Sequence, residues 1–178
     1  MKTALVLYLA AWVSSACAVL LDRIAVTVDN DVITQGEVYE EIRVTAFQNG
    51  TRPDFSPAAR RDAAERLVDQ DLIRREMLLT RYPQPAEGDL RKVLDELKRS
   101  RFHGDDAAYR QALGQYGITD ENVRAHLLWQ ISALRFTGYR FEQNAGGKTK
   151  SATDPDLDEW LKSSRSQARI TFHEEAFQ

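Results

Sequence analysis

Cysteine is almost absent from this chain. Its 178 residues include a single cysteine, Cys17, which lies within an apolar leader. Once the leader is removed the chain has no thiol, which excludes a disulfide framework, a thiolate metal site and a thiol nucleophile. An exported protein of this kind has to be stabilised by its apolar core. The roughly 160 residues after the leader are enough for one domain of ordinary size.

Histidine is scarce as well. His103, His126 and His173 are the three in the chain, and none has a second histidine at ligand spacing. A metal could be held by the run His173 to Glu175, but we interpret that run as a solvated polar tail. We therefore expect no metal site and no cofactor.

Two further patterns do not meet the requirements of catalysis. Asp69 and Asp71 are two residues apart, so on a helix they point to different sides. We expect them to be surface charges, Asp71 beside Arg75 and Asp69 on the exposed side. The run Gly146 to Thr149 lacks the first glycine of a phosphate-binding loop and follows a helix rather than a strand. The sequence predicts no catalytic residue.

Charge of one sign is not concentrated anywhere. The formal net charge is −3, with 24 Lys and Arg against 27 Asp and Glu. This mildly acidic balance provides no basic surface for nucleic acid or anionic lipid. A nucleic-acid partner is therefore not expected.

The first 18 residues have the layout of a secretory signal peptide. Lys2 precedes the apolar run Thr3–Val13, and Ala16 and Ala18 are small residues at the two positions that a leader peptidase reads. The run is shorter than the roughly 20 apolar residues of a membrane span, so stable membrane insertion is not expected. A lipoprotein anchored at Cys17 is the alternative. The interpretation places a single domain at 19–178 in the periplasm, although export to the cell exterior stays open.

Helical signals dominate that domain. Ile24–Val28 and Val32–Ile33 are typical of short strands around a turn. Thr34 and Glu37 fit a capping box, and the glycine turn from Gly114 to Gly117 fits a left-handed helix terminator. Start and stop signals predict six helices and a last strand: 34–47, 56–81, a helix around 90–97, a helix from 105 through 113, 119–141, a helix from 154 through 161, and the strand 169–172. Residues 143–153 form a polar linker.

Three segments of the chain carry a family resemblance. They are Leu21–Thr34, Arg66–Ile73 and Leu157–Phe172. In this order they resemble the SurA and PrsA class of exported folding chaperones, and the chain is similar to the SurA amino-terminal domain over nearly all of 19–178. The resemblance implies a mainly α-helical domain with a small β-sheet that joins the amino-terminal and carboxyl-terminal strands.

The same resemblance implies a function. In this family a parvulin-type prolyl isomerase domain usually lies between the helical body and the returning helix, where this chain has only the linker 143–153. The chain therefore resembles the chaperone without its enzyme. It is expected to act as a holdase that binds unfolded or nascent exported proteins, outer-membrane proteins among them. A dedicated assembly factor for one partner is the alternative, and a homodimer stays open.

The helix predicted at 119–141 has two apolar faces. Trp129 and Phe136 lie on one of them, and the other is formed by Val123, Leu127, Ile131, Leu134 and Phe141. Two such faces favour a helix packed on both sides, with Trp160 against Trp129 or Phe136. In the alternative interpretation one face is left for a client, and the candidate client-binding residues are then Trp129, Phe136 and Trp160.

The leader generates a first prediction. Exported protein should begin at Val19, because the small residues Ala16 and Ala18 direct cleavage after Ala18. Measurement of the intact mass of the exported protein checks it. A mass that retains Met1, or one that includes acyl chains on Cys17, would contradict it.

Overall fold

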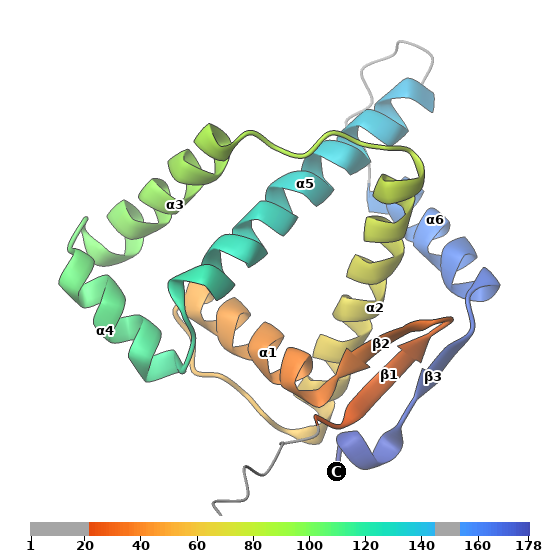
Figure 1. The fold of residues 1–178 in the computed structure, drawn as a ribbon, viewed down its shortest axis with the longest axis horizontal. Helices are drawn as coiled ribbons and strands as arrows, with labels where there is room; N and C mark the ends of the chain where they lie inside the picture. The colour runs from red at the N-terminus through yellow and green to blue at the C-terminus, as the bar shows by residue number, and fades with distance from the viewer. Residues whose placement is uncertain (1–21, 145–153) are drawn as a thin grey trace, which may run out of the picture.

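The computed structural model describes residues 22–144 and 154–178, and the side chains of 22–140 and 157–178. The expected signal peptide 1–18 and most of the linker 143–153 lie outside these ranges. The described part is mainly α-helical with a small antiparallel sheet, as predicted (Figure 1). Its elements are β1 Ile24–Val28, β2 Asp31–Thr34, α1 Gln35–Asn49, α2 Pro57–Leu79, α3 Glu87–Phe102, α4 Asp106–Tyr116, α5 Asp120–Asn144, α6 Asp154–Gln167, β3 Ile170–Phe172 and the 3-10 helix Glu174–Ala176.

Local sequence signals determine most of the helix ends. The capping box is present, because the Glu37 amide donates to Thr34 Oγ1 and the Thr34 amide donates to the Glu37 carboxylate. α1 ends at Gly50, which has a φ of 69°. Glycine is favoured there by this left-handed conformation, and a Cβ would lie 2.6 Å from the end of the Arg101 side chain. Gly117 ends α4 in the same left-handed conformation, as predicted.

The sheet brings the two ends of the described chain together. Its strand order is β2-β1-β3, both pairs are antiparallel, and Val26 lies opposite Phe172. Figure 1 shows β3 along β1, with the C-terminus close to the start of β1. Of the expected solvated tail, Glu174 and Glu175 are exposed, but the residues on either side of them are packed: Thr27 Oγ1 and His173 Nε2 are 3.1 Å apart, and Phe177 is only 5% exposed. The apolar Phe177 ring packs in the first part of the core and holds this segment in place. The charged residues that precede it in the sequence gave no sign of this burial.

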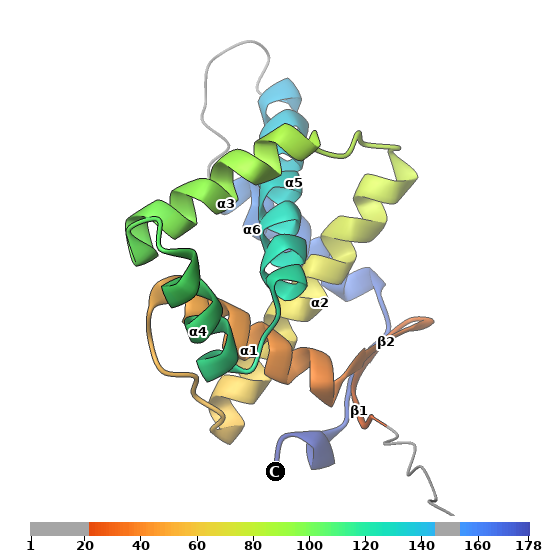
Figure 2. The ribbon, with the colours of Figure 1, turned by 60° about the vertical axis from the view of Figure 1, so that its left-hand side comes forward.

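The apolar residues form three clusters rather than one core. The first joins the sheet to α1 and α2 and contains Val26, Val68 and Phe177. The second joins α1, α3, α4 and α5 around Phe47, which packs against Phe102, Tyr109 and Tyr116. The third joins α2, α5 and α6 around Ile73, Met77 and Phe136. Figures 1 and 2 both show α3 and α4 on the side of α1 and α5 away from the sheet.

Two helices expose apolar residues that their periodicity assigns to buried faces. Leu134 was expected beside Val123 and Leu127, but it is 76% exposed whereas those two are buried. Leu78 and Leu79, at the end of α2, are 68% and 80% exposed. Periodicity reports which residues share a face, but the neighbouring helices decide how far along the helix that face is covered.

Ion pairs attach α2 to its neighbours. They confirm that Asp71 lies beside Arg75, but they correct the expectation that Asp69 and Asp71 are simple surface charges. Asp69 accepts from Arg165 of α6 at 2.7 Å. Asp71 lies 2.8 Å from Arg75, and its side chain is only 15% exposed. The guanidinium of Arg75 also contacts Asp29 at 2.7 Å and Asp31 at 2.9 Å, so it attaches α2 to the turn between β1 and β2.

The sheet generates a second prediction. Removal of residues 169–178 should destabilise the whole domain cooperatively, because β1 loses its β3 partner and the first cluster loses Phe177. The single change Phe177→Ala should lower the free energy of unfolding by about 3–5 kcal/mol. Thermal and denaturant unfolding check both variants, with Glu175→Ala at an exposed neighbour as the control. Unfolding of the truncated chain at the wild-type midpoint would contradict the prediction.

Candidate functional site

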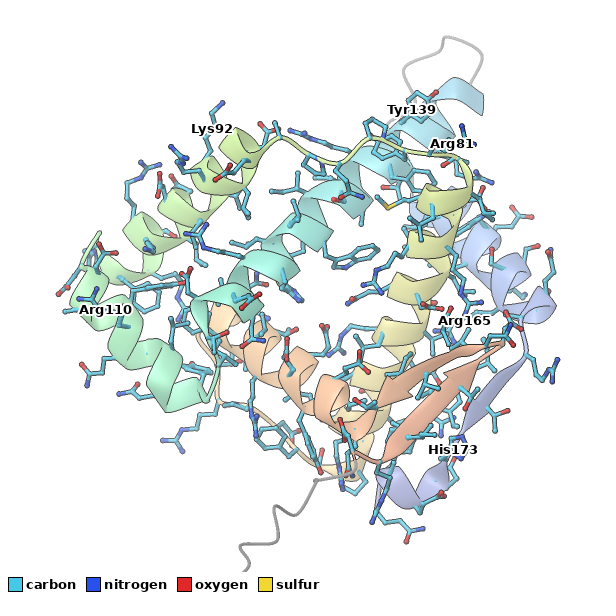
Figure 3. The ribbon with its side chains drawn as sticks, viewed as in Figure 1. Arg81, Lys92, Arg110, Tyr139, Arg165 and His173 are labelled. Atoms are coloured by element: carbon cyan, nitrogen blue, oxygen red, sulfur yellow. The ribbon has the colours of Figure 1, made fainter. Side chains whose placement is uncertain are left out.

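A cleft lies between α1, α2 and α5 and has a volume of about 220 Å³. We call it the central cleft. Figure 3 shows side chains of these three helices projecting toward the space between them. The lining is mixed. Its apolar members are Val32, Ile33, Val44, Leu67, Ala125 and Trp129, and its polar members are Glu37, Glu40, Glu41, Gln70, Asp71, Arg74, Asn122 and His126.

The central cleft lies where the three apolar clusters approach one another. Ile33 on its wall belongs to the first cluster, Val44 belongs to the second, and Trp129 packs against the third. Three separately packed clusters leave a space between them that apolar side chains do not fill. The cleft is therefore a consequence of how the helices are packed.

A buried carboxylate joins the three helices at this cleft. Glu41 of α1 is 6% exposed, and its two oxygens lie 3.3 Å from Arg66 Nε of α2 and 3.5 Å from His126 Nδ1 of α5. Thr45 Oγ1 also donates to Glu41, at 3.3 Å. Burial raises the pKa of Glu41, but the hydrogen bonds and charges of His126 and Arg66 outweigh it, and the pKa lies below its ordinary value.

Asp71, on the α2 wall, is in a different electrostatic situation. Burial and the neighbouring Asp31 raise its pKa, although Arg75 and Arg74 oppose the shift. Arg75 is shared among three carboxylates and cannot neutralise all of them. The charge of Asp71 is therefore only partly compensated by Arg75, although Arg74 lies on the same wall.

The three predicted client-binding residues occupy different positions. Phe136 is 2% exposed and belongs to the third cluster, where a client could not reach it. Trp160 packs on the same cluster from α6, with the Arg140 guanidinium 5.5 Å from its ring. Trp129 also packs there but is partly exposed and lines the central cleft, with Arg74 at 5.5 Å from its ring. Of the three, Trp129 alone borders this cleft.

A second hollow lies at the far end of α2 and α5. It has a volume of about 720 Å³, and its lining comes from two segments, 80–83 and 136–140. Tyr82 and Tyr139 are in contact there, with ring centroids 5.7 Å apart. Figure 3 labels Arg81 and Tyr139 at this end of the molecule. Although it is larger than the central cleft, this hollow is a surface depression beside two segments and lacks walls from three helices.

Other kinds of site are not seen in the described part of the chain. Residues 22–144 and 154–178 contain no cluster of three or more potential metal ligands. No helix within these ranges is both long enough and apolar enough to cross a membrane. Among known proteins, no family model matches the chain, and no curated protein matches it.

The Glu41 junction could not be found from the sequence. Glu41, Arg66 and His126 lie 25 to 85 positions apart on three helices, so no local spacing connects them. The one available signal was an acidic residue among the apolar positions of α1, between Val38 and Ile42. A carboxylate at such a position indicates a buried partner, but it does not identify that partner.

The junction generates a third prediction. Glu41→Gln should lower the free energy of unfolding at neutral pH by roughly 1.5–3 kcal/mol, because Arg66 and His126 lose their contacts with a charged carboxylate. The loss should shrink on acidification. A carboxylate whose folded pKa is depressed stabilises the fold above its unfolded pKa, near 4.5, and this contribution disappears as the pH falls through the folded pKa.

Denaturant unfolding of both proteins between pH 7 and pH 3 measures this difference. Glu40→Gln is the matched control, because its carboxylate is exposed and adjacent in sequence. That variant should stay within about 0.5 kcal/mol of the wild type. A Glu41→Gln effect that is the same at every pH would show that the charge of Glu41 does not matter.

Proposed function

We propose that this chain is an exported holdase-type chaperone that resembles the SurA amino-terminal domain and acts in the periplasm on unfolded or nascent exported proteins. Outer-membrane proteins are among the expected clients. The observation that carries the proposal is the central cleft, where apolar and charged side chains line one space between three helices. A client segment can bury an apolar side chain there. By mass action, this binding lowers the concentration of free unfolded client that would aggregate.

The size of the cleft favours part of a flexible chain as its occupant. Pockets for small ligands and cofactors usually enclose about 300–1,000 Å³. The central cleft, at about 220 Å³, has room for one or two side chains of an extended segment. A site of this size binds each segment weakly, which suits a protein that must hold and release many clients.

Exposed apolar side chains outside the cleft extend the surface available to a client. Leu78, Leu79 and Tyr139 lie at the end of α2 and α5 that borders the second hollow, and Leu134 lies nearby along α5. Each is more than half exposed, at 68%, 80%, 55% and 76% respectively. An unfolded chain seated in the cleft could also contact these residues, since apolar contacts do not require a fixed geometry.

The order of the elements supports the family assignment. The chain begins with a strand, continues through a helical body, and returns through α6 to β3, which pairs with the first strand. This is the arrangement that the resemblance to the SurA and PrsA class implies.

Prolyl isomerisation is not part of the proposal. α5 ends at Asn144 and α6 begins at Asp154, so residues 145–153 are all that separates them. A folded domain needs on the order of 50 residues or more. The segment between these helices is therefore too short to be a parvulin domain.

A fourth prediction follows from the cleft. Near-stoichiometric amounts of the protein should delay the aggregation of several unrelated unfolded proteins, and moderate salt should not abolish this effect because apolar contacts contribute to binding. Trp129→Ala should weaken the protection, since Trp129 borders the cleft. Light scattering during dilution of denatured clients measures it.

Two variants separate binding from folding. Trp160→Ala is the matched control, because Trp160 packs on the same third cluster but does not line the cleft. Phe136→Ala should cost about 3–5 kcal/mol of stability as a core truncation. Protection limited to one partner would contradict the holdase proposal and favour a dedicated assembly factor. Acceleration of proline isomerisation above background would contradict the holdase proposal and favour an enzymatic function.

A further inference from the structure

The charges around the central cleft are unbalanced. Its lining includes four carboxylates, from Glu37, Glu40, Glu41 and Asp71. Three arginines face them: Arg66, Arg74 and Arg75. His126 is the remaining titratable group of the lining, and it is held against Glu41. The four carboxylates outnumber the three arginines by one, and a charged His126 would offset that difference.

Two of these carboxylates are available to a ligand. Glu37 and Glu40 are exposed residues of α1 and have no ion-pair partner among residues 22–140 and 157–178. Glu37 contacts the Thr34 amide in the capping box, which leaves its negative charge uncompensated. Glu41 and Asp71, in contrast, are held by Arg66 and Arg75. The free negative charge therefore lies along the α1 side of the cleft.

The opposite wall supplies an apolar surface that also accepts a cation. The Trp129 ring lines the cleft from α5, and the Arg74 guanidinium lies 5.5 Å from the ring centroid. Aromatic faces attract both apolar side chains and cations. A segment lying between Trp129 and the α1 carboxylates thus meets an aromatic face on one side and negative charge on the other.

We propose that the central cleft selects client segments in which Lys or Arg stands next to an aromatic or large aliphatic residue, and disfavours segments that carry Asp or Glu there. This inference rests on the proposed function and specifies its client class. The apolar side chain packs on Trp129, and the neighbouring cation lies near Glu37 and Glu40. An acidic segment of equal hydrophobicity meets like charge at the same place.

Three peptides test the selection. The first has the sequence Gly-Ser-Lys-Phe-Leu-Lys-Ser-Gly, and the other two replace both lysines by glutamine or by glutamate. Fluorescence anisotropy of labelled peptides with the mature protein should rank the affinities lysine, glutamine, glutamate. Exposed ion pairs of this kind should separate the first and the last by roughly three- to tenfold at low salt. The separation should shrink at 0.5 M salt because exposed charges are screened.

Matched variants locate the effect. Glu37→Gln with Glu40→Gln removes the free charge of the cleft, and glutamine at position 37 still completes the capping box. This double variant should bind the lysine and glutamate peptides with nearly equal affinity. Glu87→Gln with Glu159→Gln changes the net charge equally at exposed positions away from the cleft, and it should keep the wild-type ranking.

The outcomes separate this inference from the proposed function. If the glutamine peptide binds and aggregation is suppressed, but the lysine and glutamate peptides bind equally, charge selection is wrong and the holdase proposal stands. Charge selection at the cleft is also wrong if the Glu87 and Glu159 control abolishes the ranking. If none of the peptides binds and no client is protected, both proposals are overturned.

Discussion

The arrangement of α1, α2 and α5 depends on one buried carboxylate, Glu41. Its oxygens lie within 3.5 Å of Arg66 on α2 and His126 on α5, although it belongs to α1. A charge is costly to bury, and in this position it is tolerated only while its partners remain close. The junction therefore favours a single relative placement of the three helices. The central cleft has the shape that this placement leaves, with Val44, Leu67 and Trp129 on its walls.

α2 connects this junction to the rest of the domain. It contacts α1 and α5 at the cleft, α6 on its other side, and the sheet through the first cluster. Arg75 forms an ion pair with Asp29 in the β1–β2 turn. Arg165 of α6 forms ion pairs with Glu65 and Asp69 of α2. Because the apolar residues are divided among three clusters, no single core fills the middle of the molecule. An open, mixed-polarity cleft is compatible with a stable fold for this reason.

Sequence patterns predicted the features that depend on local chemistry. The capping box at Thr34 and the left-handed end of α4 at Gly117 were both found. Features that depend on contacts between distant residues were missed or misread. Leu134 lies on the predicted apolar face yet is exposed, Asp69 pairs with Arg165 of α6, and Phe177 is buried despite its charged neighbours. Of the candidate site, Trp129 was anticipated, whereas Glu41 and His126 were not, because their proximity exists only in the folded chain.

We propose that one structural element, the central cleft, binds the client. Amide hydrogen exchange of the mature protein, with and without an unfolded outer-membrane protein, tests this link most directly. We predict that the client increases protection on the segments of α1, α2 and α5 that border the cleft, around Glu40, Gln70 and Ala125, while α4 and the outer face of α3 remain unchanged. Protection confined to the second hollow near Tyr82 and Tyr139, or no change at the cleft despite client binding, would contradict it.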